Sequence, residues 1–458
     1  MMEPVIREIE KRRDGYVDEL AELLAIPSVS TDPDHAADVR RCAAYCRDAL
    51  ERIGFAAAEV HETEGHPIVT AEWTGAPDAP TVLFYGHYDV QPVDPVDLWT
   101  TPPFEATLRD GRIYGRGSAD DKGQVFCHWK AWEAHFAAHG RLPCNVKVLL
   151  EGEEEIGSQH LGPFISANRE RLAADAVVIS DSPMFARGVP SLCYGLRGLC
   201  YMEVHVRGAK SDLHSGSFGG AVANPAQALA TLLAGLQDHE HHVAIQGFYD
   251  KVRPLSERER AEYRRLPFNE SEFRHELDVP ELVGEAGFTT LERIWVRPTL
   301  DINGMVSGFT GKGAKTVLPS KASAKVSMRL VPDQDPDEVA ELFRRHVEAH
   351  VMAGVTARVE NLHGARPYLA PLDHPANRAA ARALARAFGA EPVFTREGGS
   401  IPVTVTFQEE LDATSILMGF GLPDENAHAP DENLDLENFH AGVVTSAWFY
   451  TEYARGAE

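Results

Sequence analysis

The first part of the chain carries two helical patterns of hydrophobic positions. Apolar residues recur on one face across residues 5–24. The same spacing runs across residues 36–53, where Gly54 ends it. We therefore expect two helices at the start of the chain.

Three short runs rich in β-branched and aromatic residues follow, at 81–85, 146–150 and 176–179. A helical stretch at 125–139 separates the first two. Strands that alternate with helices predict an α/β domain. We expect a mixed, largely parallel central sheet flanked by helices.

The pattern changes near residue 198. Hydrophobic and polar residues alternate strictly at 202–206 and 324–330, and helical patterns lie at 224–236 and 336–349. Alternating strands with two helices predict a small α+β domain whose sheet has one open face.

The segment Lys251–Glu276 is rich in Arg and Glu, and we interpret it as a solvated helical excursion rather than a binding patch. A helical pattern resumes at 377–388. We expect one domain built from residues 1–197 and 373–458, with a second domain inserted at 198–372.

Length and composition limit the class of protein. A chain of 458 residues exceeds the roughly 250–300 residues at which single cores stop growing, so two domains are expected. With 44% hydrophobic and 25% charged residues the chain is of the globular kind. Its net charge of −25 repels phosphate backbones, so nucleic acids are not expected partners.

The sequence shows no signal for export or membrane insertion. The first twenty residues carry scattered charges, and no apolar run approaches the ~20 residues that span a bilayer. Six cysteines are spread along the chain without a CxxC pair, which fits reduced core residues rather than a disulfide scaffold. We expect a cytoplasmic protein that does not bind membranes.

Polar residues follow each predicted strand of the first domain. His87 and Asp89 follow the first strand, Glu154 and Glu155 the second, and Asp181 the third. Open α/β sheets place their sites outside the carboxyl ends of such strands. The plain alternatives are a structural His–Asp pair and a solvated acidic loop.

Two further runs add ligand-type side chains. Residues 115–123 form a glycine-dense run with Asp120 and Asp121, whose plain interpretation is a turn with Asp121 as a helix N-cap. His428 lies far downstream, in the run 426–432. Two histidines with several carboxylates suit a pair of divalent ions such as zinc, with one bridging carboxylate and a free base nearby.

Four runs together resemble one metallopeptidase family: 86–92, 115–123, 151–158 and 426–432. The family is that of carnosinase, cytosolic non-specific dipeptidase, glutamate carboxypeptidase, succinyl-diaminopimelate desuccinylase and aminoacylase. The runs occur in the family's order along the whole chain. The resemblance implies a zinc-exopeptidase-like catalytic domain with an inserted lid and dimerisation domain.

The resemblance also implies roles at the metal centre. The implied ligands of two divalent ions are His87, Asp120, Glu155, Asp181 and His428. Asp120 would bridge the ions, with His87 and Asp181 on one of them and Glu155 and His428 on the other. Asp181 stands where the carboxypeptidase and desuccinylase branches carry Glu, which points to the dipeptidase branch.

Two more residues of this region receive roles from the resemblance. Glu154 would be the general base that activates a hydroxide between the ions. Asp89 would fix the orientation of His87 through a hydrogen bond, and a purely structural bond is the alternative. The peptide between Asp120 and Asp121 is often cis in this family.

The inserted domain would complete the site. His214 lies in a run, 212–216, that resembles the motif whose histidine reaches the active site of the neighbouring subunit, so a homodimer is implied. His214 would then donate a hydrogen bond to the oxyanion. Without the resemblance, a surface histidine in a Ser/Gly-rich turn is the plainer interpretation.

Three residues are expected to bind the substrate. Thr316 and Arg329 lie in runs that resemble the carnosinase branch, where the matching Thr and Arg bind the substrate's C-terminal carboxylate. Ser400, in a run that resembles the family's glycine loop, would lie near the backbone of the bound peptide. The alternatives are an exposed strand position for Arg329 and a plain turn around Ser400.

We therefore expect a metallo-exopeptidase that hydrolyses the amide bond of dipeptides or short peptides. It would use two divalent ions per subunit, with zinc expected first and manganese or cobalt as alternatives. An amidohydrolase acting on N-acyl or N-carbamoyl amino acids is the second hypothesis, because the same groups attack any amide. A non-catalytic metal-binding protein is remote, because the base Glu154 is present.

Overall fold

The computed structural model describes residues 2–399 and 401–456, which form two compact units. The first unit consists of Met1–Tyr194, Ala370–Thr395 and Val403–Glu458, and the second of Gly195–Leu369 and Arg396–Pro402. The chain thus leaves the first unit after Tyr194 and returns to it at Ala370.

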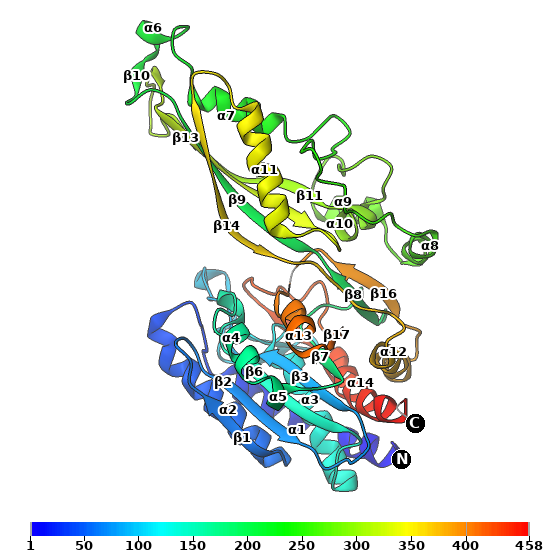
Figure 1. Cartoon of the computed structure of the whole chain (residues 1–458). Coiled ribbons are helices and arrows are strands. Elements are labelled where there is room, and N and C mark those ends of the chain that lie inside the picture. Colours follow the sequence, from blue (N-terminus) through cyan, green and yellow to red (C-terminus); the bar gives the residue numbers. More distant parts are fainter. Residues whose placement is uncertain (1, 400, 457–458) are drawn as a thin grey trace. The chain divides into compact units, whose positions relative to one another are not determined.

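A nine-stranded sheet has most of its strands in the first unit (Figure 1), whereas β15 and the last residues of β8 and β16 fall within the bounds of the second. Its strands are β1 (Ala56–His61), β2 (Ile68–Trp73), β3 (Thr81–His87), β6 (Asn145–Glu151), β7 (Ala176–Ile179), β8 (Ser191–Leu196), β15 (Tyr368–Leu369), β16 (Val393–Glu397) and β17 (Thr414–Leu417). The order is β1-β2-β6-β3-β7-β17-β8-β15, and β16 also pairs with β8. Strands β6, β3, β7 and β17 are parallel, whereas β1, β2, β8 and β15 pair antiparallel with their neighbours. The predicted mixed sheet is confirmed, and its parallel part is the run β6-β3-β7-β17.

Two sets of helices flank this sheet (Figure 1). One set is α1 (Glu3–Leu24), α2 (Ala36–Ile53), α3 (Lys122–His139), α12 (Pro375–Phe388) and α14 (Leu436–Arg455). The other is α4 (Leu161–Ala167), α5 (Arg169–Leu172) and α13 (Val403–Leu411). Short 3₁₀ turns lie at η1 (Pro33–His35), η2 (Val96–Leu98) and η3 (Glu154–Ile156). Among the helices that the structure describes, none combines the length and the apolar composition that a bilayer span requires.

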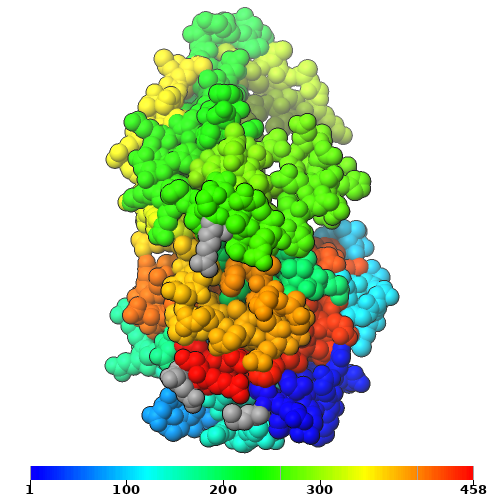
Figure 2. Space-filling view, turned by 90° about the vertical axis from the view of Figure 1, so that its right-hand side faces the viewer, coloured from blue at the N-terminus to red at the C-terminus, as the bar shows by residue number. Residues whose placement is uncertain are grey.

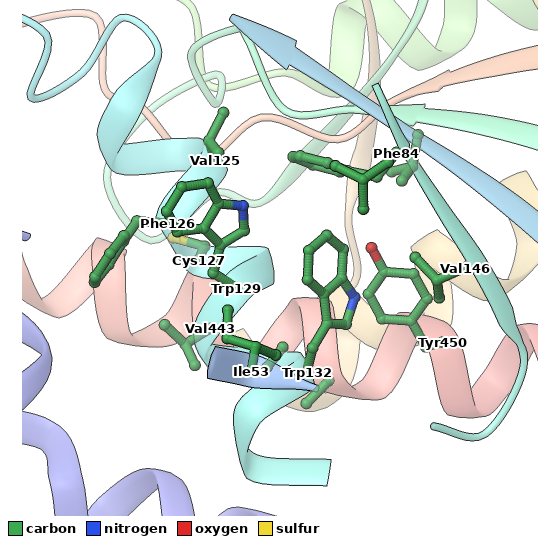
Figure 3. Close-up of a cluster of buried hydrophobic side chains, with 14 of the residues drawn as sticks. Ile53, Phe84, Val125, Phe126, Cys127, Trp129, Trp132, Val146, Val443 and Tyr450 are labelled. Carbon is green, nitrogen blue, oxygen red and sulfur yellow. The ribbon is translucent and has the colours of Figure 1, made fainter. Parts of the chain in front are cut away.

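Helix α3 is buried on nearly all sides and fixes the residues that precede it (Figure 3). Its Trp132 contacts Phe84 of β3 and Tyr450 of α14, with ring centroids 5.3 and 5.9 Å apart. Trp129, one turn earlier, is 1% exposed. Because α3 begins directly after Asp121, its packing anchors the chain there.

A small antiparallel sheet joins two distant parts of the first unit. Its strands are β4 (Thr107–Arg109), β5 (Arg112–Tyr114) and β18 (Asn433–Asp435), in the order β18-β5-β4. Asn433 pairs with Tyr114, and the Gly115 N–H donates to the Glu432 carbonyl at 3.0 Å. The run 426–432 therefore lies beside the run 115–123.

The second unit contains the α+β arrangement that the alternating pattern predicts. Its antiparallel sheet has the order β11-β13-β9-β14, with β9 (Gly198–Arg207), β11 (Thr299–Ser307), β13 (Lys321–Leu330) and β14 (Thr356–Ala365). Helices α7 (Pro225–Ala234) and α11 (Pro336–His350) pack against this sheet, where alternate residues such as Met202 and Val204 are buried. The other residues of β9 and β13 are partly or fully exposed.

Smaller elements complete the second unit. Strands β10 (Leu213–His214) and β12 (Val317–Leu318) form a two-stranded ribbon. Helix α6 (Ser215–Phe218) follows β10 directly in the chain and contacts both strands. The other elements are the short helices α8 (Glu257–Arg265), α9 (Glu270–Glu276) and α10 (Thr290–Trp295). Figure 2 shows the face that carries α8 and α9, whose green atoms are open to solvent there. The interpretation of Lys251–Glu276 as a solvated helical segment agrees with this structure.

Candidate metal centre

The five predicted metal ligands meet at the carboxyl edge of the first unit's sheet. They are His87 at the end of β3, Asp120 before α3, Glu155 in η3, Asp181 after β7 and His428 in the loop before β18. They form two groups, His87–Asp120–Asp181 and Asp120–Glu155–His428, in which the ligand atoms all lie within 4.8 Å of one another. Because Asp120 belongs to both groups, two cations bound here would share its carboxylate.

The first group is organised around the buried ring of His87. Its Nε2 lies 3.0 Å from Asp120 Oδ1 and 3.9 Å from Asp181 Oδ2. On the other side of the ring, Nδ1 lies 3.1 Å from the Asp89 carbonyl oxygen and 3.4 Å from its Oδ1. Asp89 therefore fixes which nitrogen of His87 faces the site.

The carboxylate of Asp89 also fixes the acidic turn η3. Its two oxygens accept the backbone N–H groups of Glu154 and Glu155, at 3.3 and 3.1 Å. Asp89 is fully buried, so these bonds satisfy a charge that water cannot reach. Asp89 thus orients both the ring of His87, through its carbonyl oxygen, and Glu155, a member of the second group, through its carboxylate.

The second group lies around His428, whose side chain is 55% exposed. His428 Nε2 lies 2.8 Å from Asp120 Oδ2 and 3.4 Å from Glu155 Oε2. Gln91 Nε2 donates to the same Glu155 oxygen at 2.6 Å. His428 has a φ of 61°, in the left-handed region that residues other than glycine adopt uncommonly.

A buried carboxylate fixes the loop that presents Asp120. Glu432 accepts the backbone N–H groups of Gly117, Ala119 and Asp120 at 3.0, 2.9 and 3.1 Å. It also accepts a hydrogen bond from Arg116 Nη1 at 2.7 Å, and both of these side chains are buried. Four charge-assisted hydrogen bonds hold the loop in one conformation.

Close packing explains two glycines of the quoted runs. A Cβ on Gly123 would lie 1.9 Å from the Ser118 carbonyl oxygen, and one on Gly86 would lie 2.5 Å from Val125 Cγ2. Larger residues do not fit at either position. The Asp120–Asp121 peptide between them is cis, as the resemblance implied.

The acidic run after β6 is mostly buried. Glu151 is 1% exposed and accepts hydrogen bonds from Tyr85 Oη at 2.5 Å and Ser158 Oγ at 2.9 Å. Glu153 is 4% exposed, and its Oε2 lies 2.8 Å from His160 Nδ1. The alternative of a solvated acidic loop is therefore wrong for these residues.

The charges of the site favour bound cations. A hydrogen bond to Asp120 raises the pKa of His428 to about 9. Burial opposes charge on His87, but hydrogen bonds to Asp120 and Asp89 raise its pKa well above the ordinary value. Carboxylates that stabilise imidazolium rings also stabilise divalent ions, and the mixed N/O donor set fits zinc, manganese or cobalt.

Unlike Glu155, which follows it directly, Glu154 belongs to neither ligand group of the described residues. Burial raises the pKa of its carboxyl to about 8, and the carboxylates of Asp181, Glu155 and Asp120 add to this effect. A carboxyl that exchanges its proton near neutral pH suits general base catalysis.

In the second unit, His214 and Thr316 lie together. Strand β10 pairs with β12, and the Ser215 N–H donates to the Thr316 carbonyl at 3.2 Å. His214 is exposed, and its Nδ1 accepts the Gly216 N–H at 3.1 Å. In the neutral ring the proton is then on Nε2, which is free to act as a donor.

Arg329 lies apart from this pair. It is half-buried near the end of β13, whereas the ribbon with His214 adjoins the beginning of that strand (Figure 1). The distance along β13 from Lys321 to Arg329 is roughly 26 Å, at about 3.3 Å per residue. Within one chain, His214 and Thr316 therefore do not adjoin Arg329. Ser400 lies outside the described residues.

Sequence reasoning gave no role to three residues that hold the site together: Gln91, Arg116 and Glu432. Each belongs to one of the runs that carry the family resemblance, which was the only signal available. Their partners come from other runs, as in the bond from Arg116 to Glu432. The sequence pattern within one run does not reveal a hydrogen bond to a residue of another run.

Comparisons with known proteins agree with this geometry. The chain matches the model of Peptidase family M20/M25/M40 over residues 83–449, a span that includes all five candidate ligands. It is 34% identical over 462 residues to the Cys-Gly metallodipeptidase dug1 of Schizosaccharomyces pombe, with 97% of each chain covered. It is also 34% identical to the human Beta-Ala-His dipeptidase, covering 99% of this chain and 93% of that one.

A solved structure extends the likeness to three dimensions. The di-peptidase Dug1p from Saccharomyces cerevisiae matches with a TM-score of 0.84 and 32% identity, and 99% of each chain is covered. The motifs, the sheet and these matches agree over nearly the whole chain. The chain therefore belongs to peptidase family M20/M25/M40, in the branch of carnosinase and the cytosolic dipeptidases.

Proposed function

We propose that this protein is a metallo-exopeptidase that hydrolyses dipeptides with two divalent ions bound at the candidate metal centre. The observation that carries this proposal is the pair of ligand groups that share Asp120. The names of the relatives add support, because they describe dipeptidases and include a metallodipeptidase. These names do not favour an enzyme for N-acyl or N-carbamoyl amino acids.

The metal centre is assigned as follows. His87 and Asp181 would hold one ion, Glu155 and His428 would hold the other, and Asp120, which belongs to both groups, would be available to each. When bound, divalent ions polarise the carbonyl of the scissile amide and lower the pKa of water; zinc is the first expectation, with manganese or cobalt as alternatives.

Glu154 moves the protons in this mechanism. Its carboxylate takes a proton from the attacking water and passes it to the nitrogen of the leaving amine. A pKa raised by burial to about 8 allows the same group to accept and release a proton near neutrality. Asp89 contributes indirectly, because it holds the ring of His87.

Residues of the second unit bind the substrate. The planar guanidinium of Arg329 pairs with the C-terminal carboxylate of the dipeptide, and Ser400 contacts its backbone. His214 donates from Nε2 to the oxyanion that forms at the carbonyl. Thr316, which lies beside His214, adds a contact to the C-terminal carboxylate of the substrate. The separation of His214 and Thr316 from Arg329 within one chain supports their delivery from a partner subunit.

A homodimer formed by the second unit, with that unit also acting as a lid, is part of the proposal. Strand β11 is an edge of the four-stranded sheet, and its residues Ile302, Met305 and Val306 are 48%, 49% and 68% exposed. An apolar edge strand is a typical association surface.

A cytoplasmic location is also proposed. All six cysteines are buried and free, although Cys42 and Cys46 lie one helical turn apart. Free cysteines fit a reducing compartment.

The first test measures bound metal and hydrolysis together. Purified protein is assayed for metal content and then against a panel of dipeptides and N-acetyl amino acids, before and after chelation. We expect two ions per subunit and dipeptide cleavage that chelation abolishes and zinc or manganese restores. If only N-acetyl amino acids were cleaved, the protein would be an amidohydrolase for N-acyl amino acids rather than a dipeptidase. If the protein bound no metal, the assignment of the five residues as metal ligands would be wrong.

The second test addresses the shared site. Glu154→Gln and His214→Ala variants are each expected to be nearly inactive as homodimers. In a mixed dimer, one of the two sites receives an intact Glu154 and an intact partner His214, so activity returns in part. Mixtures that stay inactive at every ratio would rule out donation of His214 by the partner.

A further inference from the structure

Residues 251–297 of the second unit pack against the turn that carries Gly398 and Gly399. This segment contains α8, α9 and α10, and no motif of the family accounts for it. The glycine turn, defined as residues 397–399, belongs to the run that the resemblance assigns to the substrate. The contacts between the two lie entirely within the second unit.

An ion pair makes the first contact. Glu259 of α8 pairs through Oε1 with Arg396 Nη2, and Arg396 directly precedes the glycine turn. The Arg396 side chain is only 10% exposed, so water screens the pair weakly. The other oxygen of Glu259 accepts Ser256 Oγ at 2.8 Å in a capping box, which fixes the carboxylate at the start of α8.

Backbone packing makes the second contact. A Cβ on Gly398 would lie 2.8 Å from Arg197 Nη2 and 3.3 Å from the Ile294 carbonyl oxygen. Gly398 is therefore held between a guanidinium and the backbone of α10. Arg197 also donates from its backbone N–H to the Glu397 carbonyl at 3.2 Å and from Nη1 to the Arg297 carbonyl at 3.5 Å.

The segment that makes these contacts is itself rigidly held. Arg297 bonds to both oxygens of the buried Glu285, at 2.8 and 2.5 Å. The guanidinium of Arg297 lies 4.4 Å from the ring centre of Phe288 and 5.2 Å from that of Tyr249. A bidentate ion pair between two rings gives the far end of the segment a fixed position.

Apolar packing is incomplete next to the ion pair. A cavity of about 110 Å³ is lined by Leu255, Val296 and Val331 together with Glu259 and Arg396. The Glu259–Arg396 pair is a polar link from α8 to β16 beside this cavity.

We propose that residues 251–297 brace the glycine turn, with Glu259 acting through Arg396 as a positioning residue that sets how tightly the dipeptide binds. The substrate in this statement rests on the proposed function, whereas the brace does not. The turn would contact the substrate backbone in the ground state and the transition state alike. Loosening it should raise KM and leave kcat nearly unchanged.

The test compares two glutamates of the same helix. Glu259→Gln removes the charge that pairs with Arg396, and Glu262→Gln is the matched control, since Glu262 contacts only Arg265 in the described hydrogen bonds and ion pairs. For Glu259→Gln we expect KM for a cleaved dipeptide to rise on the order of tenfold with kcat within about twofold. The double variant Glu259→Arg, Arg396→Glu exchanges the two charges and should bring KM most of the way back to the wild-type value. Either of these two substitutions alone should leave KM raised.

Hydrogen exchange of the peptide that contains Gly398 and Gly399 tests the brace without relying on activity. The exchange should be faster in Glu259→Gln than in wild type and in Glu262→Gln, with the β9 peptide unchanged as a control for folding. Arg396→Gln removes the same pair from the other side and should give the same result if Glu259→Gln folds poorly. Equal exchange in all variants would overturn the brace; absence of dipeptide cleavage by wild type would instead refute the proposed function.

Discussion

Two charged regions of this protein have opposite surroundings. The run Glu151–Glu155 begins at the last residue of β6, and its Glu151 and Glu153 are 1% and 4% exposed. The segment Lys251–Glu276 is also rich in charge, yet most of its side chains reach solvent. Two of its glutamates, Glu257 and Glu262, pair with arginines on the same helix.

The chemistry of the two regions follows from this difference. Burial raises the pKa of Glu151 to about 8, whereas hydrogen bonds from Thr290 lower the pKa of the mostly exposed Glu270. A buried acid is available for proton transfer or metal binding, and a solvated acid is charged and passive. The position of a charged run after an apolar strand, rather than its charge density, thus indicates a site.

The largest effect is expected for Glu154→Gln in the buried run. The amide cannot accept a proton, so kcat should fall by roughly 10²–10⁴ while both ions stay bound. Steady-state hydrolysis and metal content by mass spectrometry measure the two quantities. Retained activity would show that another group is the base, and lost metal would show that Glu154 is a ligand.

Glu432→Gln should have the next largest effect, because it removes a buried charge on which four donors converge. We expect the free energy of unfolding to drop by roughly 3–5 kcal/mol and metal affinity to drop about 10–100-fold. Urea unfolding and competition with a chelator measure these changes. The control is Glu437→Gln, whose side chain is 80% exposed and pairs with Arg13; equal effects at both positions would contradict the buried-anchor assignment.

The same contrast explains what the sequence could predict. Elements were predictable because their signals are local: the helix at 36–53 ends at Gly54, and the polar residues after β3, β6 and β7 share one sheet edge because parallel strands end there. Glu432 was not assigned a role, because its loop reaches Asp120 only through the pairing of β18 with β5. The proximity of His214 to Thr316 likewise depends on the β10–β12 ribbon.

Glu151→Gln tests the burial effect through pH. The pKa of Glu151 is about 8 in the folded protein against an ordinary 4.5, so the folded state keeps a proton that the unfolded state releases between these values. Wild-type stability should therefore fall as pH rises from 5 to 8, and the uncharged glutamine should remove roughly 2–4 kcal/mol of that fall. Urea unfolding at both pH values measures the slope. The same slope in both proteins would mean that Glu151 is ionised when folded.

The smallest effect is expected in the solvated segment. Glu262 and Arg265 lie 3.3 Å apart on α8, with side chains 46% and 77% exposed. Water and salt screen such a pair, so a double-mutant cycle with Glu262→Gln and Arg265→Gln should give a coupling below about 0.5 kcal/mol. Thermal unfolding of the four proteins at low and high salt measures it. A coupling as large as the loss at Glu432 would mean that the two charged regions do not differ in the way their burial indicates, because only a desolvated pair can contribute so much.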